Sequence, residues 1–255
     1  MPTLTDARAP EGLRLYAIGD IHGRLDLLRE MHARIAADLA ARPCAKHRVI
    51  HLGDYIDRGP DSAGVVDHLI AAMQTGNMAC LAGNHDLYVP AFLKDPGSAG
   101  EHWMRYGGST SLLSWGVDPD SPALMTRPWR VLRDAFAEAL PAGHHAFFNN
   151  LSFMEQHGDY VFVHAGIRPR YALNKQRIAD LTMIREPFLG HEGDFGAIIV
   201  HGHTVVPEPQ LRHNRIALDT KAYATGILSC IVLEGGSKGL LLPGGYRSVA
   251  LDRPH

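Results

Sequence analysis

The fold class is set by LRLYAIGDIHG, residues 13–23, in which an apolar run stops at Gly19 and Asp20. A short apolar run followed by turn residues is typical of a buried strand. The same pattern returns in HRVIHLGD (47–54) and MACLAGNHD (78–86), each followed by polar residues. Between these runs, apolar residues recur at helical spacing through 28–39 and 65–73. The alternation of strands and helices predicts parallel pairing with right-handed crossovers.

The second half of the chain changes pattern. Residues 87–143 combine Pro and Gly with helical spacing, which predicts a helical insertion. From Ala146 the apolar period drops to two, which predicts strands joined by a turn at residues 157–159, and three further strands within 196–203, 211–220 and 224–236. We therefore expect a flexible N-terminus (1–12) and one α/β domain (13–255), with parallel units first and an antiparallel-rich half second.

Composition excludes several classes of protein. The 255 residues are 45% hydrophobic, which is enough for a large core, and 25 Lys plus Arg against 27 Asp plus Glu give a net charge of −2. This balance argues against a nucleic-acid partner. No apolar run reaches membrane-spanning length, and the first residues do not resemble a signal peptide, so we expect no membrane contact and a cytoplasmic location. Three scattered cysteines fit a reducing compartment.

Five polar clusters follow predicted strands, where open α/β sheets place their ligands. They are GDIHG (19–23), GDYIDRG (53–59), GNHD (83–86), HAGIRP (164–169) and HGHT (201–204). Together they supply carboxylate, imidazole and amide groups without a thiolate, which suits Mn, Fe or Zn. Two such ions can act as a clamp for in-line displacement at phosphorus.

With these motifs in this order, the sequence resembles the phosphoprotein phosphatase family of calcineurin-like metallophosphoesterases over residues 14 to about 220. HAGIRP and GGSTSLLSWG (107–116) are similar to the compact bacterial serine/threonine phosphatase branch. The resemblance implies a sandwich of two mixed β-sheets flanked by helices. It also implies a metal-dependent hydrolase of phosphomonoesters, a serine/threonine protein phosphatase that could also accept phosphotyrosine, with a phosphorylated protein or peptide as its partner.

The resemblance also implies a site with two divalent metal ions. Manganese is the expected metal, with iron or zinc as alternatives. Carried over position by position, one ion would be held by Asp20 and His22, the other by Asn84, His164 and His203, and Asp54 would bridge them.

The remaining roles implied by the resemblance concern catalysis. A metal-bridging hydroxide would attack phosphorus in line. His85 would protonate the leaving oxygen, and Asp57 would orient the His85 imidazole. Arg58 and Arg185 would hold the phosphoryl oxygens, although Met183 stands where the family has a tryptophan before the second arginine.

Some residues near the motifs have a second interpretation. Lys221 follows Asp-Thr where bacterial relatives often have glycine, so it either faces the substrate or is a solvated loop lysine. His201 is expected to support a ligand rather than bind metal. Trp103 and Trp115 are expected to pack the insertion or to line the substrate groove, and the other histidines to have surface or core roles.

Two other functions compete with the phosphatase. The first is a symmetrical diadenosine tetraphosphate hydrolase, whose members share the GD, GNH and HAG motifs. Those relatives usually lack the acidic residue of DRG, so Asp57 favours the monoester hydrolase. The second is a catalytically silent metal-binding scaffold, which is disfavoured because every motif position is filled. Oligomeric state cannot be inferred from the sequence.

Overall fold

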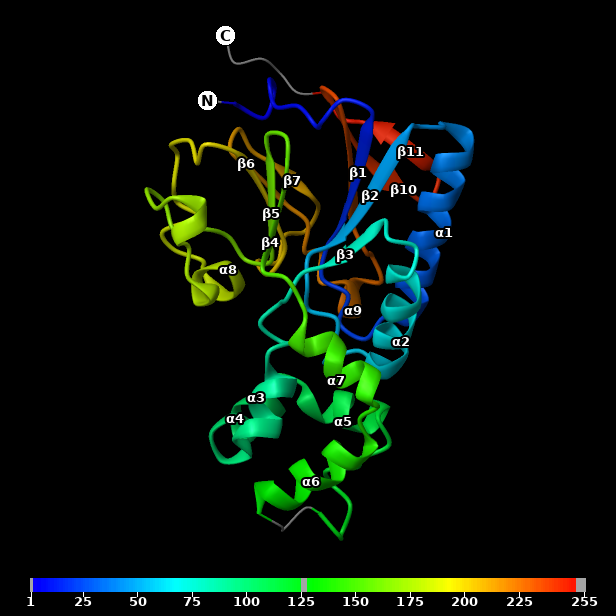
Figure 1. The fold of residues 1–255 in the computed structure, drawn as a ribbon, viewed down its shortest axis with the longest axis vertical. Coiled ribbons are helices and arrows are strands. Elements are labelled where there is room, and N and C mark those ends of the chain that lie inside the picture. Colours follow the sequence, from blue (N-terminus) through cyan, green and yellow to red (C-terminus); the bar gives the residue numbers. More distant parts are fainter. Residues whose placement is uncertain (1, 125–127, 251–255) are drawn as a thin grey trace.

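The computed structural model describes residues 2–124 and 128–250, which form two β-sheets packed face to face above a group of helices (Figure 1). The predicted insertion and the predicted domain also include residues 125–127 and 251–255, and the predicted N-terminal segment includes Met1; these positions lie outside the described residues. The division into segments and one domain stays a prediction.

The first sheet has six strands in the order β11-β10-β9-β1-β2-β3, of which β1, β2 and β3 run parallel. The remaining neighbours pair antiparallel. The strands are β1 (Leu13–Ile18), β2 (Lys46–His51), β3 (Met78–Cys80), β9 (Cys230–Glu234), β10 (Ser237–Leu242) and β11 (Gly245–Ser248).

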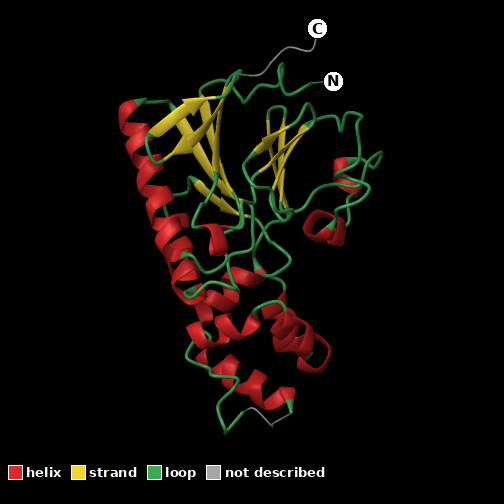
Figure 2. Cartoon of the chain, turned by 180° about the vertical axis from the view of Figure 1, so that it is seen from behind, coloured by secondary structure: helices red, strands yellow, loops and turns green. Residues whose placement is uncertain are grey.

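The second sheet has the order β4-β5-β6-β8-β7, with β5, β6 and β8 parallel. Its strands are β4 (Met154–His157), β5 (Tyr160–Val163), β6 (Ile198–His201), β7 (Gln210–Leu211) and β8 (Arg215–Ala217). Figure 2 shows the two sheets side by side with helices on the outside. The predicted sandwich of two mixed sheets flanked by helices is confirmed.

Alternation along β1 explains why the sheets stack. Leu15 and Ala17 join the buried cluster between the two sheets, whereas Tyr16 and Ile18 join the cluster under the helices. The helices over that face are α1 (Leu25–Ala41) and α2 (Ser62–Met73), and the outer face of the second sheet carries α8 (Ile178–Met183). No helix within the described ranges is long and apolar enough to cross a membrane.

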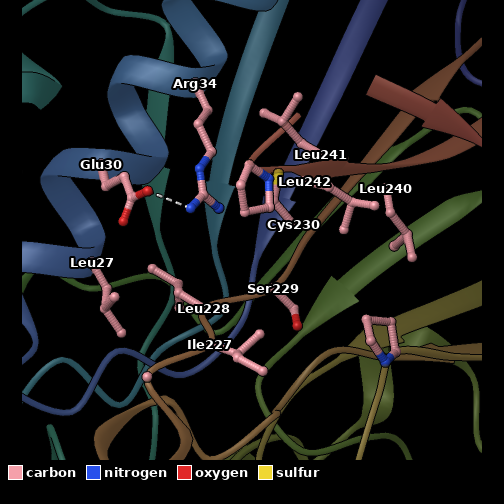
Figure 3. A pocket seen from close by; sticks show the side chains of 13 residues that line it. Leu27, Glu30, Arg34, Ile227, Leu228, Ser229, Cys230, Leu240, Leu241 and Leu242 are labelled. Atoms are coloured by element: carbon pink, nitrogen blue, oxygen red, sulfur yellow. Dashed lines mark hydrogen bonds and ion pairs between the residues drawn. The ribbon is translucent and has the colours of Figure 1, made fainter. Parts of the chain in front are cut away.

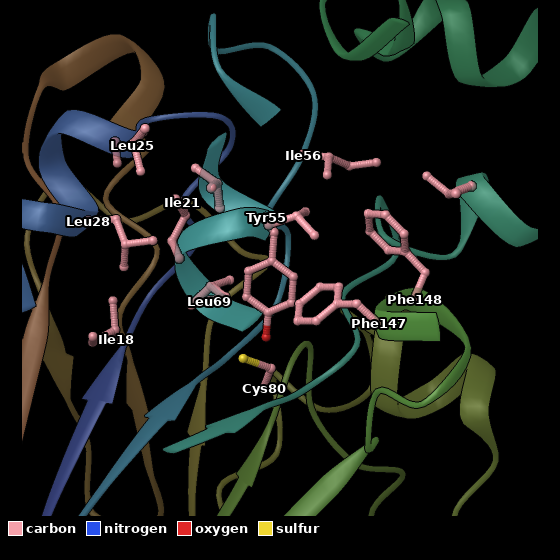
Figure 4. Packing of buried hydrophobic residues seen from close by; sticks show 14 of the residues in the cluster. Ile18, Ile21, Leu25, Leu28, Tyr55, Ile56, Leu69, Cys80, Phe147 and Phe148 are labelled. Atoms are coloured by element: carbon pink, nitrogen blue, oxygen red, sulfur yellow. The ribbon is translucent and has the colours of Figure 1, made fainter. Parts of the chain in front are cut away.

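The insertion is helical and extends further than predicted. Its helices are α3 (Tyr88–Lys94), α4 (Pro96–Arg105), α5 (Gly108–Ser114), α6 (Trp129–Ala139) and α7 (Ala142–Asn149). The strand predicted from Ala146 is wrong at its start, because residues 146–149 belong to α7. Phe147 and Phe148 are buried on neighbouring positions, and Phe147 packs against Tyr55 with ring centroids 5.6 Å apart (Figure 4). Two adjacent buried aromatic residues suit a helix with packing partners on two sides, since Phe147 contacts Tyr55 after β2 and Phe148 contacts Trp115 at the end of α5.

The segment expected to be a flexible N-terminus packs against the sandwich. Leu4, Ala7 and Ala9 are buried in the cluster between the sheets. The Leu4 amide donates to the His213 carbonyl at 2.7 Å, and the Ala9 amide donates to the Gly235 carbonyl at 2.9 Å. Apolar burial and main-chain hydrogen bonds therefore fix residues 4–9, which the polar composition of the segment did not indicate.

An apolar pocket lies between α1, β10 and residues 226–230 (Figure 3). Leu228 and Leu241 line it, and the Glu30–Arg34 ion pair of α1 contributes its polar atoms. Its lining includes none of the predicted site residues, so we assign it to the packing of α1 on the sheet.

Three histidines outside the motifs form a hydrogen-bonded chain between α1, α2 and β2. His51 Nδ1 lies 3.1 Å from the Ala79 carbonyl, so this nitrogen must donate and His51 Nε2 must accept. His32 Nε2 donates to that nitrogen at 2.9 Å, and His68 Nε2 donates to His32 Nδ1 at 2.9 Å. His51 and His32 each accept at one nitrogen and are therefore neutral, and burial lowers the pKa of His32 to about 3 and that of His51 to about 4.

This chain predicts a loss of stability in mild acid. In the unfolded chain these histidines have a pKa of about 6.5, so they become protonated below that pH. The buried histidines of the folded protein stay neutral there, so the free energy of unfolding falls as the pH decreases toward their lower pKa values. Between pH 7.5 and 5.5, we expect the free energy of unfolding of His32→Gln to fall by about 1 kcal/mol less than that of the unmodified protein. Urea unfolding of chelator-treated protein measures this difference. His47→Gln, which removes a histidine of β2 outside this chain of hydrogen bonds, is the control; equal pH dependence of all three proteins would contradict the prediction.

Candidate active site

The predicted motifs meet where the parallel strands of both sheets end. GDIHG follows β1, GDYIDRG follows β2 and GNHD comes after β3, while HAGIRP and HGHT follow β5 and β6. Because parallel strands share one C-terminal edge, each sheet brings its polar loops to the same side. The sandwich places the two edges next to each other, so residues far apart in the sequence surround one point.

Asp54 lies at that point. His22 Nε2 is 3.4 Å from Asp54 Oδ2, and His164 Nε2 is 3.4 Å from Asp54 Oδ1. Two groups of potential metal ligands share this carboxylate: one contains His22 and His85, and the other contains His164 and His203. The carboxylate thus offers one oxygen to each group, which is the arrangement needed for a bridging ligand.

The histidines present unprotonated nitrogens to Asp54. His22 Nδ1 donates to the Ile56 carbonyl at 2.7 Å, and His164 Nδ1 donates to the Leu52 carbonyl at 2.9 Å. These bonds fix the tautomers and leave both Nε2 lone pairs aimed inward. His203 Nε2 is buried without a hydrogen-bond partner among the described residues.

Imidazole nitrogens whose lone pairs face a carboxylate form an arrangement that can bind a cation. Burial lowers the pKa of His22 and of His203 to about 3, so both imidazoles remain neutral, which is the metal-binding form. An unprotonated imidazole nitrogen and a carboxylate oxygen are both acceptors, so they cannot hydrogen-bond to each other, but both are ligands for divalent metals. The site is therefore suited to metal binding.

The other two predicted ligands lie beside these groups. Asn84 Oδ1 is 3.2 Å from His164 Nε2, which places it with the second group. The Asp20 carboxylate accepts from the His203 amide at 3.1 and 3.2 Å. Burial and the charges of Asp219 and Asp54 raise the pKa of Asp20. Within the described residues neither group includes Asp20, so its assignment as a ligand stays a prediction.

Asp86 is a supporting residue to which the sequence analysis gave no role. Its buried carboxylate accepts from the amides of Asp54 at 2.8 Å, Tyr55 at 2.9 Å and Gly83 at 2.8 Å. It therefore ties the loop after β2 to the loop after β3 and fixes the backbone under Asp54. The only sequence signal was its position as the last residue of GNHD.

The predicted proton donor and its partner are in contact. His85 Nδ1 lies 2.6 Å from Asp57 Oδ2, and Arg58 donates to His85 Nε2 at 2.9 Å and to His22 Nε2 at 3.1 Å. Burial opposes protonation of His85, but the charges of Asp54 and Asp57 outweigh it and raise the pKa of the imidazole. In this arrangement His85 Nε2 accepts from Arg58, and Nδ1 is the nitrogen that carries a proton toward Asp57.

Backbone strain is concentrated at the site. Among the described residues, seven other than glycine have positive φ, and all except Arg170 are predicted site residues. A non-glycine residue pays a conformational cost at positive φ, and such costs persist where function requires a particular direction of the side chain. These six are His22, Asp54, Asp57, Arg58, His203 and Lys221.

Arg185 and Lys221 lie at the rim. The Arg185 guanidinium is 3.5 Å from the His203 carbonyl, beside the second ligand group. Lys221 is exposed, and its ammonium is 5.7 Å from the ring centre of Tyr223, a residue that sequence reasoning missed. The Tyr223 ring packs edge-on against His22, so Lys221 lies near the ligand group of His22, whereas Arg185 lies near that of His203. No sequence signal distinguished Tyr223 from an ordinary loop residue.

His201 does not face the metal ligands. It is fully buried, its ring packs against Phe188 at 5.0 Å, and its Nδ1 donates to the Gly202 carbonyl at 3.0 Å. It thus holds the backbone just before His203, in keeping with a supporting role.

Comparison with known proteins identifies the class. Residues 13–228 match the family described as calcineurin-like phosphoesterase, so the chain belongs to this family of metallophosphoesterases and the predicted calcineurin-like membership is confirmed. The asymmetrical bis(5'-nucleosyl)-tetraphosphatase PrpE of Anoxybacillus flavithermus is 26% identical over 84% of this chain and 88% of its own. A symmetrical bis(5'-nucleosyl)-tetraphosphatase of Pseudomonas fluorescens is 28% identical over 63% of this chain and 44% of its own.

A solved structure shares the fold. The cold-active protein-tyrosine phosphatase of a Shewanella species superposes with a TM-score of 0.61 at 16% identity, covering 95% of this chain and 83% of its own. At this identity the likeness concerns the fold alone.

Gly83 provides a test of the geometry around Asp54. A Cβ at Gly83 would collide with Asp54 Oδ1 and with the Asp54 backbone nitrogen. We expect Gly83→Ala to displace the carboxylate and weaken binding of divalent metal by about ten-fold or more, measured by calorimetric titration. Gly143→Ala is the control, because a Cβ at that glycine of α7 meets nothing within 4 Å. Unchanged metal affinity in Gly83→Ala would show that Asp54 is not a ligand.

Proposed function

We propose that the protein hydrolyses the phosphoanhydride chain of dinucleoside polyphosphates such as diadenosine tetraphosphate. The similarity to the PrpE tetraphosphatase carries this proposal, because it extends over most of both chains. The similarity to a symmetrical tetraphosphatase supports the same substrate class from a second relative. Of the functions expected from the sequence, this was the alternative to the protein phosphatase.

The distribution of cations supports an extended polyanion. Arg58 lies at the centre of the site, while Arg185 and Lys221 lie at the rim beside His203 and Tyr223. A phosphoryl group at the metal site would have Arg58 beside it. The further phosphates of a polyphosphate chain would add negative charge, which the exposed Arg185 and Lys221 would offset.

The metal site would be filled by two divalent ions, and manganese is our proposal for activity in vitro. His22, Asp54, Asn84, His164 and His203 would hold them, with Asp20 beside them. Bound ions supply Lewis acidity and a nucleophile at neutral pH. The chain's own residues would do the rest: Arg58 would orient the phosphoryl oxygens, Asp57 holds the His85 tautomer through Nδ1, and His85 would deliver a proton from Nε2 to the leaving oxygen.

A second candidate is the phosphomonoester hydrolase, acting on phosphorylated serine, threonine or tyrosine in a protein or peptide. The His85–Asp57 contact of 2.6 Å favours it. An alkoxide leaving group needs protonation more than a nucleotide phosphate does, so a well-aligned proton donor is of greater use for monoesters.

Product analysis separates the two candidates. Manganese-loaded protein is incubated with diadenosine tetraphosphate and, separately, with a panel of phosphopeptides, and products are resolved by chromatography. We expect nucleotide products and little phosphate from the peptides. Two ADP would indicate symmetrical cleavage, and AMP with ATP asymmetrical cleavage. Rapid dephosphorylation of peptides with intact dinucleotide would reject the proposal in favour of the second candidate.

Lys221 tests the role of the rim. Lys221 has φ 57°, a conformation that glycine adopts without cost, so Lys221→Gly removes the cation with little disturbance of the backbone. We expect the KM for diadenosine tetraphosphate to rise by about three- to ten-fold, with a smaller change in kcat. Arg170→Gly is the matched control, since Arg170 is also exposed with φ 66°. An unchanged KM in Lys221→Gly would identify Lys221 as a solvated loop residue.

A further inference from the structure

We propose that Trp103, together with Ser111, is a positioning residue that sets the orientation of Asp57 and thereby of the His85 proton donor. The inference rests on the role of His85 in the proposed function. It assigns to the helical insertion a part in the reaction, beyond packing and beyond lining a groove.

The Asp57 carboxylate is held by two side chains of the insertion. Trp103 Nε1 lies 2.9 Å from Asp57 Oδ1 and 3.0 Å from Oδ2, so the indole N–H is shared between both oxygens. Ser111 Oγ donates to Oδ1 and accepts from the Asp57 amide at 2.8 Å. Oδ2 is left with His85 Nδ1 as its other partner. Asp57 and Trp103 are both fully buried, so water cannot replace these donors.

This arrangement decides how the carboxylate is turned. The terminal torsion of an aspartate is broad, so the covalent structure alone does not fix the plane of its oxygens. An N–H donor centred between the two oxygens and a hydroxyl on one of them define that plane. The free direction of Oδ2 then points at His85, which fixes the imidazole so that Nε2 faces the site.

The insertion is itself rigid at this point. The Trp103 ring packs against Phe92 at 5.2 Å and Phe136 at 5.6 Å, in the buried cluster that α3, α4 and α6 share. The Gly107 carbonyl, in the turn between α4 and α5, also accepts from the Arg58 amide at 3.5 Å. Helices about 50 residues away in sequence from the catalytic loop thus hold two adjacent catalytic positions.

The insertion contains a matched control. Trp115 is also buried there, but its Nε1 donates to His144 Nδ1 at 3.0 Å instead of to Asp57. Trp103→Phe and Trp115→Phe each keep an aromatic ring and remove one indole hydrogen bond. Only the first of these bonds belongs to the proposed positioning system.

The test is a double-mutant cycle with a leaving-group readout. Trp103→Phe, His85→Asn, the double variant and Trp115→Phe are compared for kcat on p-nitrophenyl phosphate, whose leaving group needs little protonation, and on phenyl phosphate, whose leaving group needs it. We expect Trp103→Phe to lower kcat about ten-fold or more on phenyl phosphate and less than about three-fold on p-nitrophenyl phosphate. In the His85→Asn background it should cause no further loss.

Several outcomes would overturn the inference. Equal losses on both substrates, or losses that multiply with those of His85→Asn, would mean that Trp103 only stabilises the fold. Ser111→Ala repeats the test if Trp103→Phe does not fold, as judged by circular dichroism and metal content. If the protein cleaves diadenosine tetraphosphate but no aryl phosphate, the same cycle is measured on the dinucleotide. An inactive unmodified protein would instead reject the proposed function, so the two failures remain distinct.

Discussion

The structure depends on one carboxylate, Asp54, which must serve two groups of ligands at once. Its backbone has a left-handed conformation, its side chain lies where the motif loops of the two sheets meet, and Asp86 holds the surrounding amides. Gly83 has no side chain because Asp54 occupies the space that a Cβ would need. Small departures at any of these points would separate Asp54 from His22 or His164, since each lies only 3.4 Å away.

The packing of the two sheets brings both groups of candidate ligands to Asp54. Each sheet contributes parallel strands whose ends carry candidate ligands, and the core between the sheets keeps the two edges together. The candidate metal ligands lie in the loops that follow these strands. The helical insertion contributes Trp103 and Ser111, which hold the carboxylate of Asp57, the hydrogen-bond partner of His85. The candidate metal ligands and the contacts that orient Asp57 thus come from separate parts of the chain.

The sequence predicted the features that repeat locally. Strands ending in polar turns gave the parallel units, and motifs of three to seven residues gave the positions that gather around Asp54. Contacts between distant segments had no such signal. Nothing in the sequence near Trp103 indicates that its indole meets Asp57, and Leu4 is buried in a cluster that also takes in residues from both sheets, as far along the chain as Leu240. Substrate class was equally hidden, because the motifs describe chemistry at phosphorus and not what the phosphorus is attached to.

The central proposal is that Asp54 is shared between two metal ions. The most direct measurement is anomalous diffraction at the manganese edge from crystals grown with manganese. A bridging Asp54 predicts two peaks on opposite sides of its carboxylate, about 3.5–4 Å apart, one beside His22 and one beside His164 and His203. A single peak, or peaks that do not contact Asp54, would contradict it.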